Sequence, residues 1–339
     1  MFKRVFKIIA VIAVIVATGV TVGAYVLWQD MQTALDKPIE ITKSEIYQLQ
    51  RGTNVRTLSK AMAQNGWVQE ALFFEIEARR QKLANHLKAG SYEINPGDTP
   101  RGLLGKFADG ETAKFFISFI EGMTLKQVLA VTSANPLLLQ TLGELNESEI
   151  IEAISPADKE SLEGWIFPST YQFEAHTTDL DILKRAHTKM KEVLAFHWET
   201  RAADLPYDSP IEALTMASIV EKETGQAAER KEIAGVFVRR LNKGMKLQTD
   251  PTVIYGMGDS FDGNLRRKDL RQDTPYNTYT RYGLPPTPIA MPGEASIEAA
   301  LHPAPGESFY FVAKGDGWHQ FSNTLKAHNA AVRKYQLKK

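Results

Sequence analysis

The sequence predicts an α+β protein with an N-terminal transmembrane helix, a small βααβ module and a larger α+β domain. An uncharged apolar run covers residues 8–28, short strand and helix patterns alternate from residue 44 onward, and a strongly patterned helix begins at residue 209. The predicted boundaries are 1–7 for a cytoplasmic segment, 8–28 for the membrane span, 29–43 for a tether, 44–97 for the module and 98–339 for the larger domain.

The composition is that of a folded protein in which positive and negative charges balance. Hydrophobic side chains make up 43% and charged side chains 24% of the 339 residues, which suits globular domains. Lys+Arg and Asp+Glu each number 40, so nucleic-acid binding has no electrostatic footprint. Cys is absent, which excludes thiol nucleophiles, disulfides and Cys-type zinc sites. We therefore expect no cofactor, no metal and no nucleic-acid partner.

The N-terminal run has the length of a membrane-spanning helix. Lys3, Arg4 and Lys7 precede it and Asp30 follows it, so the positive-inside rule places the N-terminus in the cytoplasm. A cleaved signal peptide is the alternative, but its apolar core is usually about 7–15 residues long, and no Ala-x-Ala site follows this run. We expect a retained single-pass anchor in the inner membrane, a polar tether carrying Pro38, and a periplasmic bulk.

The module after the tether shows four elements bounded by turn residues. Asn95-Pro96-Gly97-Asp98 closes it with turn chemistry. The order strand, helix, helix, strand is similar to that of LysM-type glycan-binding modules, a likeness of topology that other small α+β modules share. The predicted strands are residues 45–49 and 92–94, and the predicted helices are residues 55–64 and 69–83.

The larger domain alternates strands, helices and loops. The stretch 135–160 is acidic and reads as helical between Pro136 and Pro156, whereas 162–173 is aromatic-rich and irregular. Beyond Leu247 the chain is rich in Pro, Gly, Tyr and Asn, which indicates loops over short elements. The other predicted elements are strands at 114–120 and 309–313 and helices at 124–131, 179–201, 229–243 and 328–337.

One helix carries the candidate chemistry. Ser209 and Glu212 form a capping-box pattern around Pro210, so a helix begins there. Glu221 and Glu223 lie near its C-terminus, where the helix dipole and apolar neighbours raise a carboxyl pKa toward that of a general acid. Two residues apart, they lie about 200° apart around the helix, so they cannot share one cleft. The alternative is a solvated helix end.

Loops downstream of this helix concentrate amides, hydroxyls and tyrosines. Aromatic rings stack on pyranose faces, and Gln, Asn and Thr hydrogen-bond sugar hydroxyls and N-acetyl groups. An ordinary surface of turns has a similar composition, so composition alone leaves both interpretations open. The candidate substrate-binding residues here are Gln248, Thr249, Asp250, Tyr276, Asn277, Thr278 and Tyr279.

These motifs carry a family resemblance. The segments 217–224, 247–253, 276–279 and 283–286, together with 162–165, 302–304 and 319–329, resemble the YceG-like endolytic murein transglycosylases in content and order. The likeness covers about residues 40–335. One departure is Ala290-Met291-Pro292-Gly293, where a polar pair is expected before Pro-Gly, so a polar contact from that loop is in doubt.

The resemblance implies a reaction. Lytic transglycosylases break the β-1,4 bond between N-acetylmuramic acid (MurNAc) and N-acetylglucosamine (GlcNAc) without water, because the 6-hydroxyl of the muramic residue attacks its own anomeric carbon. One carboxyl then serves where ordinary glycosidases need two. Glu221 matches the family's catalytic glutamate, and Glu163 matches a second acidic position with a structural or substrate-orienting role. The resemblance also implies that the enzyme works beside penicillin-binding protein synthases and that its cuts limit the elongation of glycan strands.

Two other classes of protein are alternatives. A catalytically silent scaffold would bind peptidoglycan strands through the LysM-like module alone. A wall peptidase or amidase would need a nucleophile or a metal set, but the chain has no His-Glu-x-x-His, and no Ser is followed three residues later by Lys. His302, His319 and His328 would have to converge in space to hold a metal.

Overall fold

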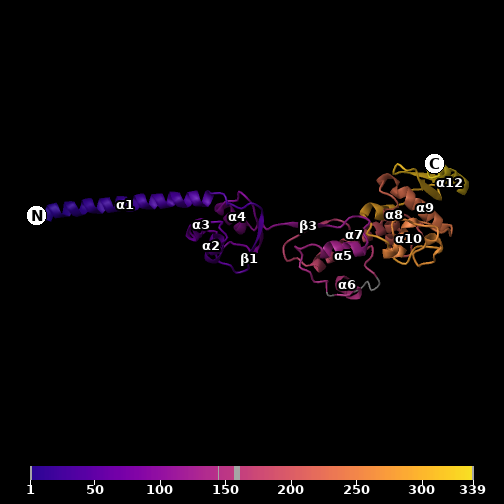
Figure 1. Ribbon diagram of the computed structural model, residues 1–339, viewed down its shortest axis with the longest axis horizontal. Helices are drawn as coiled ribbons and strands as arrows, with labels where there is room; N and C mark the ends of the chain where they lie inside the picture. The colour runs from indigo at the N-terminus through magenta and orange to yellow at the C-terminus, as the bar shows by residue number, and fades with distance from the viewer. Residues whose placement is uncertain (1, 144, 156–160, 338–339) are drawn as a thin grey trace. The chain divides into compact units, whose positions relative to one another are not determined.

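A computed structural model describes residues 2–143, 145–155 and 161–337. The chain divides into two compact units, residues 1–115 and 116–339. Helices and short strands are mixed throughout, as Figure 1 shows, and the described residues form three two-stranded sheets. The predicted combination of an apolar N-terminal helix with α+β structure is confirmed.

The N-terminal helix is longer than the predicted span. Helix α1 covers Phe2–Asp36, and its stretch from Arg4 to Asp36 is long and apolar enough to cross a membrane. The prediction of a tether from residue 29 was wrong for this part of the chain. Met31 and Leu35 lie on one helix face and, with Ile39, are buried in the core of the first unit. Gly19 and Gly23 lie within the helix, but no Pro occurs before Pro38, so the helix continues directly into folded structure.

The first unit contains the predicted βααβ order. Strands β1 (Glu45–Leu49) and β2 (Gly90–Ile94) pair antiparallel, and helices α2 (Val55–Gln64) and α3 (Ala71–Arg80) lie between them in sequence. Helix α4 (Pro100–Asp109) adds Leu103, Leu104 and Phe107 to the same core. The unit therefore continues past the predicted boundary at residue 97, because α4 has its apolar face in this core. The LysM likeness stays a prediction.

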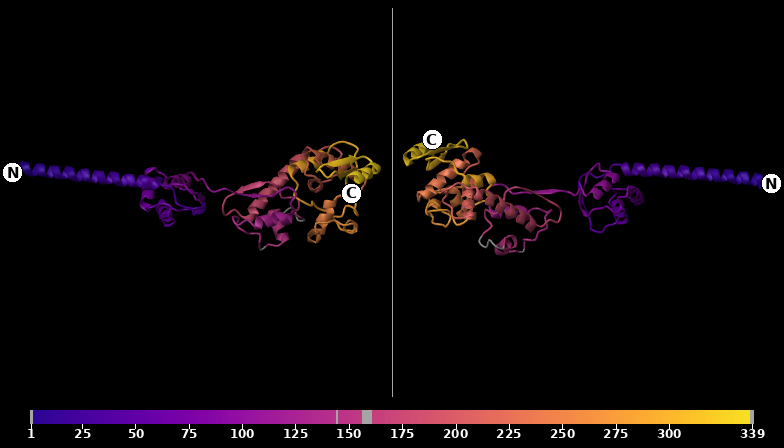
Figure 2. Two further views of the ribbon diagram at one scale, coloured as in Figure 1. Left: turned by 45° about the horizontal axis from the view of Figure 1, so that its top comes forward. Right: turned by 180° about the vertical axis from the view of Figure 1, so that it is seen from behind.

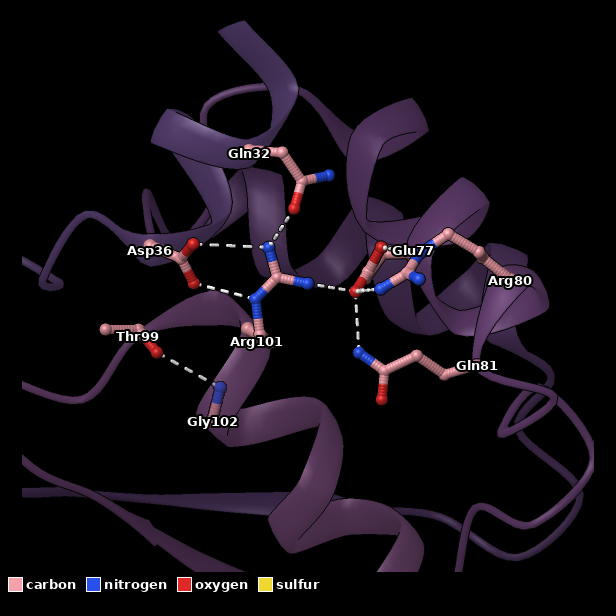
Figure 3. A network of polar contacts seen from close by, with 8 residues as sticks. All are labelled: Gln32, Asp36, Glu77, Arg80, Gln81, Thr99, Arg101 and Gly102. Carbon is pink, nitrogen blue, oxygen red and sulfur yellow. Dashed lines mark hydrogen bonds and ion pairs between the residues drawn. The ribbon is translucent and has the colours of Figure 1, made fainter. Parts of the chain in front are cut away.

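A polar network centred on the buried Glu77 joins α1, α3 and α4 in this unit (Figure 3). Arg101 of α4 donates to Asp36 at 2.7 Å and to Gln32 at 2.7 Å, both on α1, and it also pairs with Glu77 of α3. Arg80 binds the same Glu77 carboxylate through two nitrogens, at 2.7 and 2.8 Å. The end of α1 is thus held by charge-assisted bonds as well as by apolar packing.

The second unit is a set of helices with two two-stranded sheets, β3–β4 and the β5–β6 hairpin. The predicted helical stretch 135–160 was wrong for most of its described residues, 135–143 and 145–155, of which only α6 (Glu147–Ile154) is an α-helix. Residues 144 and 156–160, Pro156 among them, lie outside the described residues. The remaining elements are β3 (Phe115–Ser118), α5 (Leu125–Ser133), β4 (Thr170–Phe173), α7 (Asp179–Glu199), α8 (Pro210–Glu223), α9 (Arg230–Asn242), α10 (Asp250–Met257), α11 (Glu294–Leu301), β5 (Tyr310–Ala313), β6 (His319–Ser322) and α12 (Leu325–Tyr335).

Helix α8 lies at the centre of this unit. Its residues from Ala213 to Val220 are all buried, because α7, α9 and α11 pack around it. Helix α8 begins at Pro210 as predicted, although the Ser209 side chain makes no cap hydrogen bond. Figure 2 shows the yellow C-terminal elements packed against the rest of this unit in both views. The last turn of α8 therefore emerges from the core with Glu221 and Glu223 close to other elements.

Candidate active site

A cavity of about 470 Å³ opens beside the last residue of α8. We call it the Glu223 cavity. The end of α8, helix α9, the loop entering α10, the β5–β6 hairpin and helix α12 form its walls. Elements from five parts of the sequence thus meet at one helix end. Its charged and titratable lining residues are Glu223, Arg240, Asp250, Tyr279, Tyr310, His319 and His328.

Glu223 is the partly buried acid of this cavity. It is the last residue of α8, and the chain turns to extended backbone at Thr224. Burial, followed by the charge of Asp250, raises the pKa of Glu223 to about 7, against the hydrogen bond from Thr249 and the charges of His319 and Arg240. A carboxyl with this pKa keeps its proton to near neutral pH, as a general acid requires.

Thr249 directs its hydroxyl to this acid. It is the N-cap residue of α10 but makes no cap hydrogen bond, and its Oγ1 instead donates to Glu223 Oε1. Its backbone N–H donates to Thr278 Oγ1 at 3.1 Å, and Thr278 Oγ1 lies 2.9 Å from Thr252 Oγ1. The neighbouring Gln248 has a φ of 51°, which a side-chain-bearing residue rarely adopts. This loop is held in one conformation by hydroxyl contacts from behind.

Four of the predicted substrate-binding residues line the Glu223 cavity, namely Gln248, Thr249, Asp250 and Tyr279. Tyr279 donates to Asp250 Oδ1 at 2.5 Å, which joins the α10 start to the 276–279 segment. Burial and the hydrogen bond to Asp250 raise the pKa of Tyr279, so its hydroxyl keeps its proton. The structure thus brings these four side chains together around Glu223.

The other three predicted substrate-binding residues support the loops from behind. Asn277 is fully buried, and its Nδ2 donates to the carbonyls of Leu270 and Gln272 at 3.2 and 2.7 Å. Tyr276 packs edge-on against Tyr255 and lies 2.9 Å from Thr287 through its hydroxyl oxygen. Thr278 stands behind Thr249. None of these three is among the residues lining the Glu223 cavity, although a role in substrate binding stays a prediction.

Glu221 meets a different set of partners. Its Oε2 accepts hydrogen bonds from the Gly293 N–H at 3.0 Å and from Ser296 Oγ at 2.7 Å, both at the N-terminus of α11. Arg230 approaches its Oε1 at 3.8 Å, and the side chain is 7% exposed. As the angular separation predicts, the side chains of Glu221 and Glu223 contact different parts of the protein, Glu221 the start of α11 and Glu223 the loop entering α10. Glu221 caps a helix, and its catalytic role stays a prediction.

Glu163 is also bonded within the protein. Its carboxylate accepts from the Leu125 N–H at the start of α5, at 3.1 Å, and from the Tyr255 hydroxyl of α10 at 3.1 Å. The residue is 4% exposed and does not line the Glu223 cavity. These contacts connect α5 to α10. Of the two roles that the resemblance implies for Glu163, structural and substrate-orienting, they fit the structural one, and both stay predictions.

The sequence did not predict a second pair of titratable groups, formed by the cavity-lining His319 and by Glu229 next to it. His319 Nδ1 lies 2.7 Å from Glu229 Oε2, and the His319 backbone N–H donates to Glu229 Oε1 at 2.9 Å. Both side chains are nearly buried, at 11% and 8% exposure. The two residues are 90 positions apart, so only the family-like motif around His319 offered a signal.

Arg240 braces the same wall. Its Nε donates to the Phe309 carbonyl and its Nη1 to the Leu247 carbonyl, each at 2.6 Å, which joins α9 to β5 and to the α10 loop. Burial lowers the pKa of Arg240.

Among the described residues, no three His, Asp or Glu side chains come together as metal ligands, so His302, His319 and His328 form no such set there.

Comparisons with known proteins agree on one family. The YceG-like family matches residues 47–334. The chain is 33% identical to an endolytic murein transglycosylase of Bacillus subtilis strain 168, over 92% of this chain and 90% of that protein. It is 27% identical to an endolytic murein transglycosylase of Streptococcus pneumoniae R6, over 84% of this chain and 57% of that protein.

A solved structure is also similar. A crystal structure of a putative YceG-like protein of Listeria monocytogenes matches with a TM-score of 0.53 and 29% identity, and the match covers 85% of this chain and 99% of that one. All the lining residues of the Glu223 cavity except Gln336 lie within the residues that the family matches.

Proposed function

This chain belongs to the YceG-like family, and we propose that it cleaves the glycan strands of peptidoglycan as a lytic transglycosylase with Glu223 as its general acid. The two curated relatives described above are both named endolytic murein transglycosylases, so the protein is an enzyme of that class. The bond broken is the β-1,4 link between MurNAc and GlcNAc, within a strand. The alternative of a catalytically silent scaffold is not favoured.

The proposed reaction uses no water. The protonated Glu223 carboxyl gives its proton to the glycosidic oxygen, so that GlcNAc leaves as a neutral hydroxyl. The 6-hydroxyl of the muramic residue attacks its own anomeric carbon and leaves a 1,6-anhydroMurNAc end. Because the substrate supplies the nucleophile, the enzyme needs no second carboxylate of the kind that hydrolytic glycosidases use. The Glu223 carboxylate, once formed, can serve as an acceptor for the hydroxyl proton.

The observation that carries the proposal is the environment of Glu223. Its pKa of about 7 matches the task of a general acid, and it lines a cavity together with four residues of the sugar-binding type. Gln248 can donate to and accept from sugar hydroxyls, Asp250 can accept from them, and Tyr279 offers a ring and a hydroxyl. Glu221, in contrast, is bonded to the start of α11. We therefore assign the acid to Glu223 in preference to Glu221.

The test is a product analysis of two matched variants. Wild-type protein acting on intact sacculi should release fragments with anhydro ends, identified by mass spectrometry. Glu223→Gln keeps the size of the side chain but cannot give a proton, so product formation should fall about 10²–10⁴-fold while glycan binding remains. Glu221→Gln, on the same helix, is the control and should retain more activity. Loss in the Glu221 variant with activity in the Glu223 variant would reverse the assignment.

We also propose that α1 anchors the enzyme in the inner membrane, with the N-terminus in the cytoplasm and both folded units in the periplasm. Arg4 and Lys7 precede the apolar stretch, which supports this orientation. The enzyme would then act on nascent strands and limit their elongation beside penicillin-binding protein synthases. A reporter active only in the periplasm, fused after Lys339, should be active. A silent reporter on a stably expressed fusion would contradict the orientation.

A further inference from the structure

His319 lines the Glu223 cavity, and it is bonded to Glu229, which is not among the lining residues. This pair has no part in the function proposed above. His319 begins β6, opposite Ala313 of β5, and Glu229 precedes α9. Although Glu229 is the N-cap residue of α9, its side chain makes no cap hydrogen bond. Both carboxylate oxygens instead bind one residue, through its ring and its backbone N–H.

This contact sets the orientation of the imidazole ring. A carboxylate oxygen can only accept, so Nδ1 of His319 carries the hydrogen and the lone pair of the neutral ring is on Nε2. The Phe311 ring packs edge-on against the imidazole, with centroids 5.3 Å apart, and limits its rotation. Within the described residues, Nε2 has no hydrogen-bond partner, and His319 lines the cavity. The ring therefore offers an unpaired acceptor to a ligand there.

The proposed reaction has a use for that acceptor. If the attack of the 6-hydroxyl is concerted with departure of the leaving sugar, the hydroxyl proton must leave while Glu223 is still giving its own. We propose that His319 is a second proton-transfer residue, whose Nε2 accepts the proton of the attacking hydroxyl. This inference rests on the proposed function and divides between two groups the acid and base roles that one carboxyl would otherwise hold.

The step balances in atoms and electrons. The bond between C1 and the glycosidic oxygen breaks, its electron pair goes to that oxygen, and the oxygen takes the Glu223 proton. O6 forms a bond to C1 and loses its proton to His319 Nε2. The imidazolium, opposite the carboxylate of Glu229, then returns a proton to the Glu223 carboxylate, directly or through water. Both residues are restored without an external reactant.

Other charged groups lie on the elements around His319. Glu229 is in direct contact with its ring on one side. The titratable and charged groups on the surrounding elements are Glu223 on α8, Arg240 on α9, Asp250 on α10, Tyr279 in the loop, Tyr310 and Lys314 on or after β5, Asp316 in the hairpin turn and His328 on α12.

The test separates the two ring nitrogens in the full-length protein. His319→Asn retains a donor near the Nδ1 position for Glu229 and removes Nε2, whereas His319→Gln places an amide near Nε2 that cannot take a proton. With sacculi as substrate, both should lower kcat about 10²–10⁴-fold, with KM changed only a few-fold. Wild-type activity should rise with pH as the ring loses its proton and fall as Glu223 does. The rising limb should disappear in both variants.

Imidazole added to His319→Ala should restore part of the activity, and it should not restore Glu223→Gln, which has lost the acid. A loss confined to KM, an unchanged rising limb, or a His319→Asn variant within about threefold of wild type would overturn the inference. Failure of the proposed function can be told apart from failure of this inference. It would appear as wild-type products without anhydro ends, or as full activity in Glu223→Gln. Neither depends on a His319 variant.

Discussion

Each of the two units contains a glutamate with a shifted pKa, and the shifts have opposite signs. In the first unit, the Glu77 side chain is 0% exposed, and its hydrogen bonds from Arg80, more than the charge of Arg101, hold its pKa below the ordinary value. In the second unit, Glu223 has a hydroxyl from Thr249 as its hydrogen-bond donor, and burial raises its pKa to about 7. A buried carboxyl paired with guanidinium groups stabilises a structure, whereas one left with neutral donors keeps a proton for chemistry.

The largest expected effect on stability follows from breaking the ion-paired site. Glu77→Ala leaves Arg101 and Arg80 without their shared carboxylate. Because both guanidinium groups are partly exposed, at 25% and 47%, the loss of these charge-assisted hydrogen bonds should cost about 1.5–3 kcal/mol. Hydrogen exchange followed by mass spectrometry should show faster exchange across α3, α4 and the end of α1. Glu75→Ala on the same helix, whose partner Arg79 is exposed, should cost about 0.5 kcal/mol. Equal costs would mean that the network is not cooperative.

The two glutamates should give opposite pH dependences of stability. The lowered pKa of Glu77 contributes stability that is present above its unfolded value and is lost in acid. The raised pKa of Glu223 contributes stability that is present below 4.5 and is lost as the pH rises to about 7. Glu223→Gln should therefore stabilise the second unit at pH 8, by on the order of 3 kcal/mol at most. A variant less stable than wild type at pH 8 would contradict this reading of the site.

The pKa of Glu223 should respond in opposite directions to two neighbouring substitutions. Thr249→Val removes a hydrogen bond that lowers this pKa, so the falling limb of the pH–activity profile should move to higher pH. Asp250→Asn removes a charge that raises it, so the limb should move to lower pH. Shifts of about half to one pH unit are expected for contacts of this kind. Identical movements in both variants would show that another group controls the limb.

The smallest effect is expected at Glu221. Its carboxylate accepts from the Ser296 hydroxyl and the Gly293 N–H, so Glu221→Gln should destabilise the start of α11 by about 1 kcal/mol. Ser296→Ala removes part of the same contact, and thermal unfolding of the double variant should show less than the sum of the two single costs. Additive costs would mean that the two side chains do not act together.

Local elements were predicted well wherever the sequence pattern is strong. Strand β1 and helix α2 have the predicted bounds, and α7 and α8 begin at their predicted residues, because caps, turns and apolar periodicity are local signals. Helices α10 and α11 were read as loops, since they are short and lie in Pro- and Gly-rich sequence. The packing of α4 and of the end of α1 into the first core depends on contacts between elements, which periodicity alone does not report.

At the candidate site, the sequence by itself determined the helix, the two glutamates on different sides of it and the polar loop residues that meet one of them. Only the tertiary structure decided which glutamate they meet. Glu221 and Glu223 share a helix end, a dipole and apolar neighbours in sequence, so local chemistry treats them alike. Their difference comes from elements distant in sequence, with α11 bonded to Glu221 and the α10 loop bonded to Glu223. Desolvation and partner identity are properties of packing, and they decide which carboxyl keeps its proton.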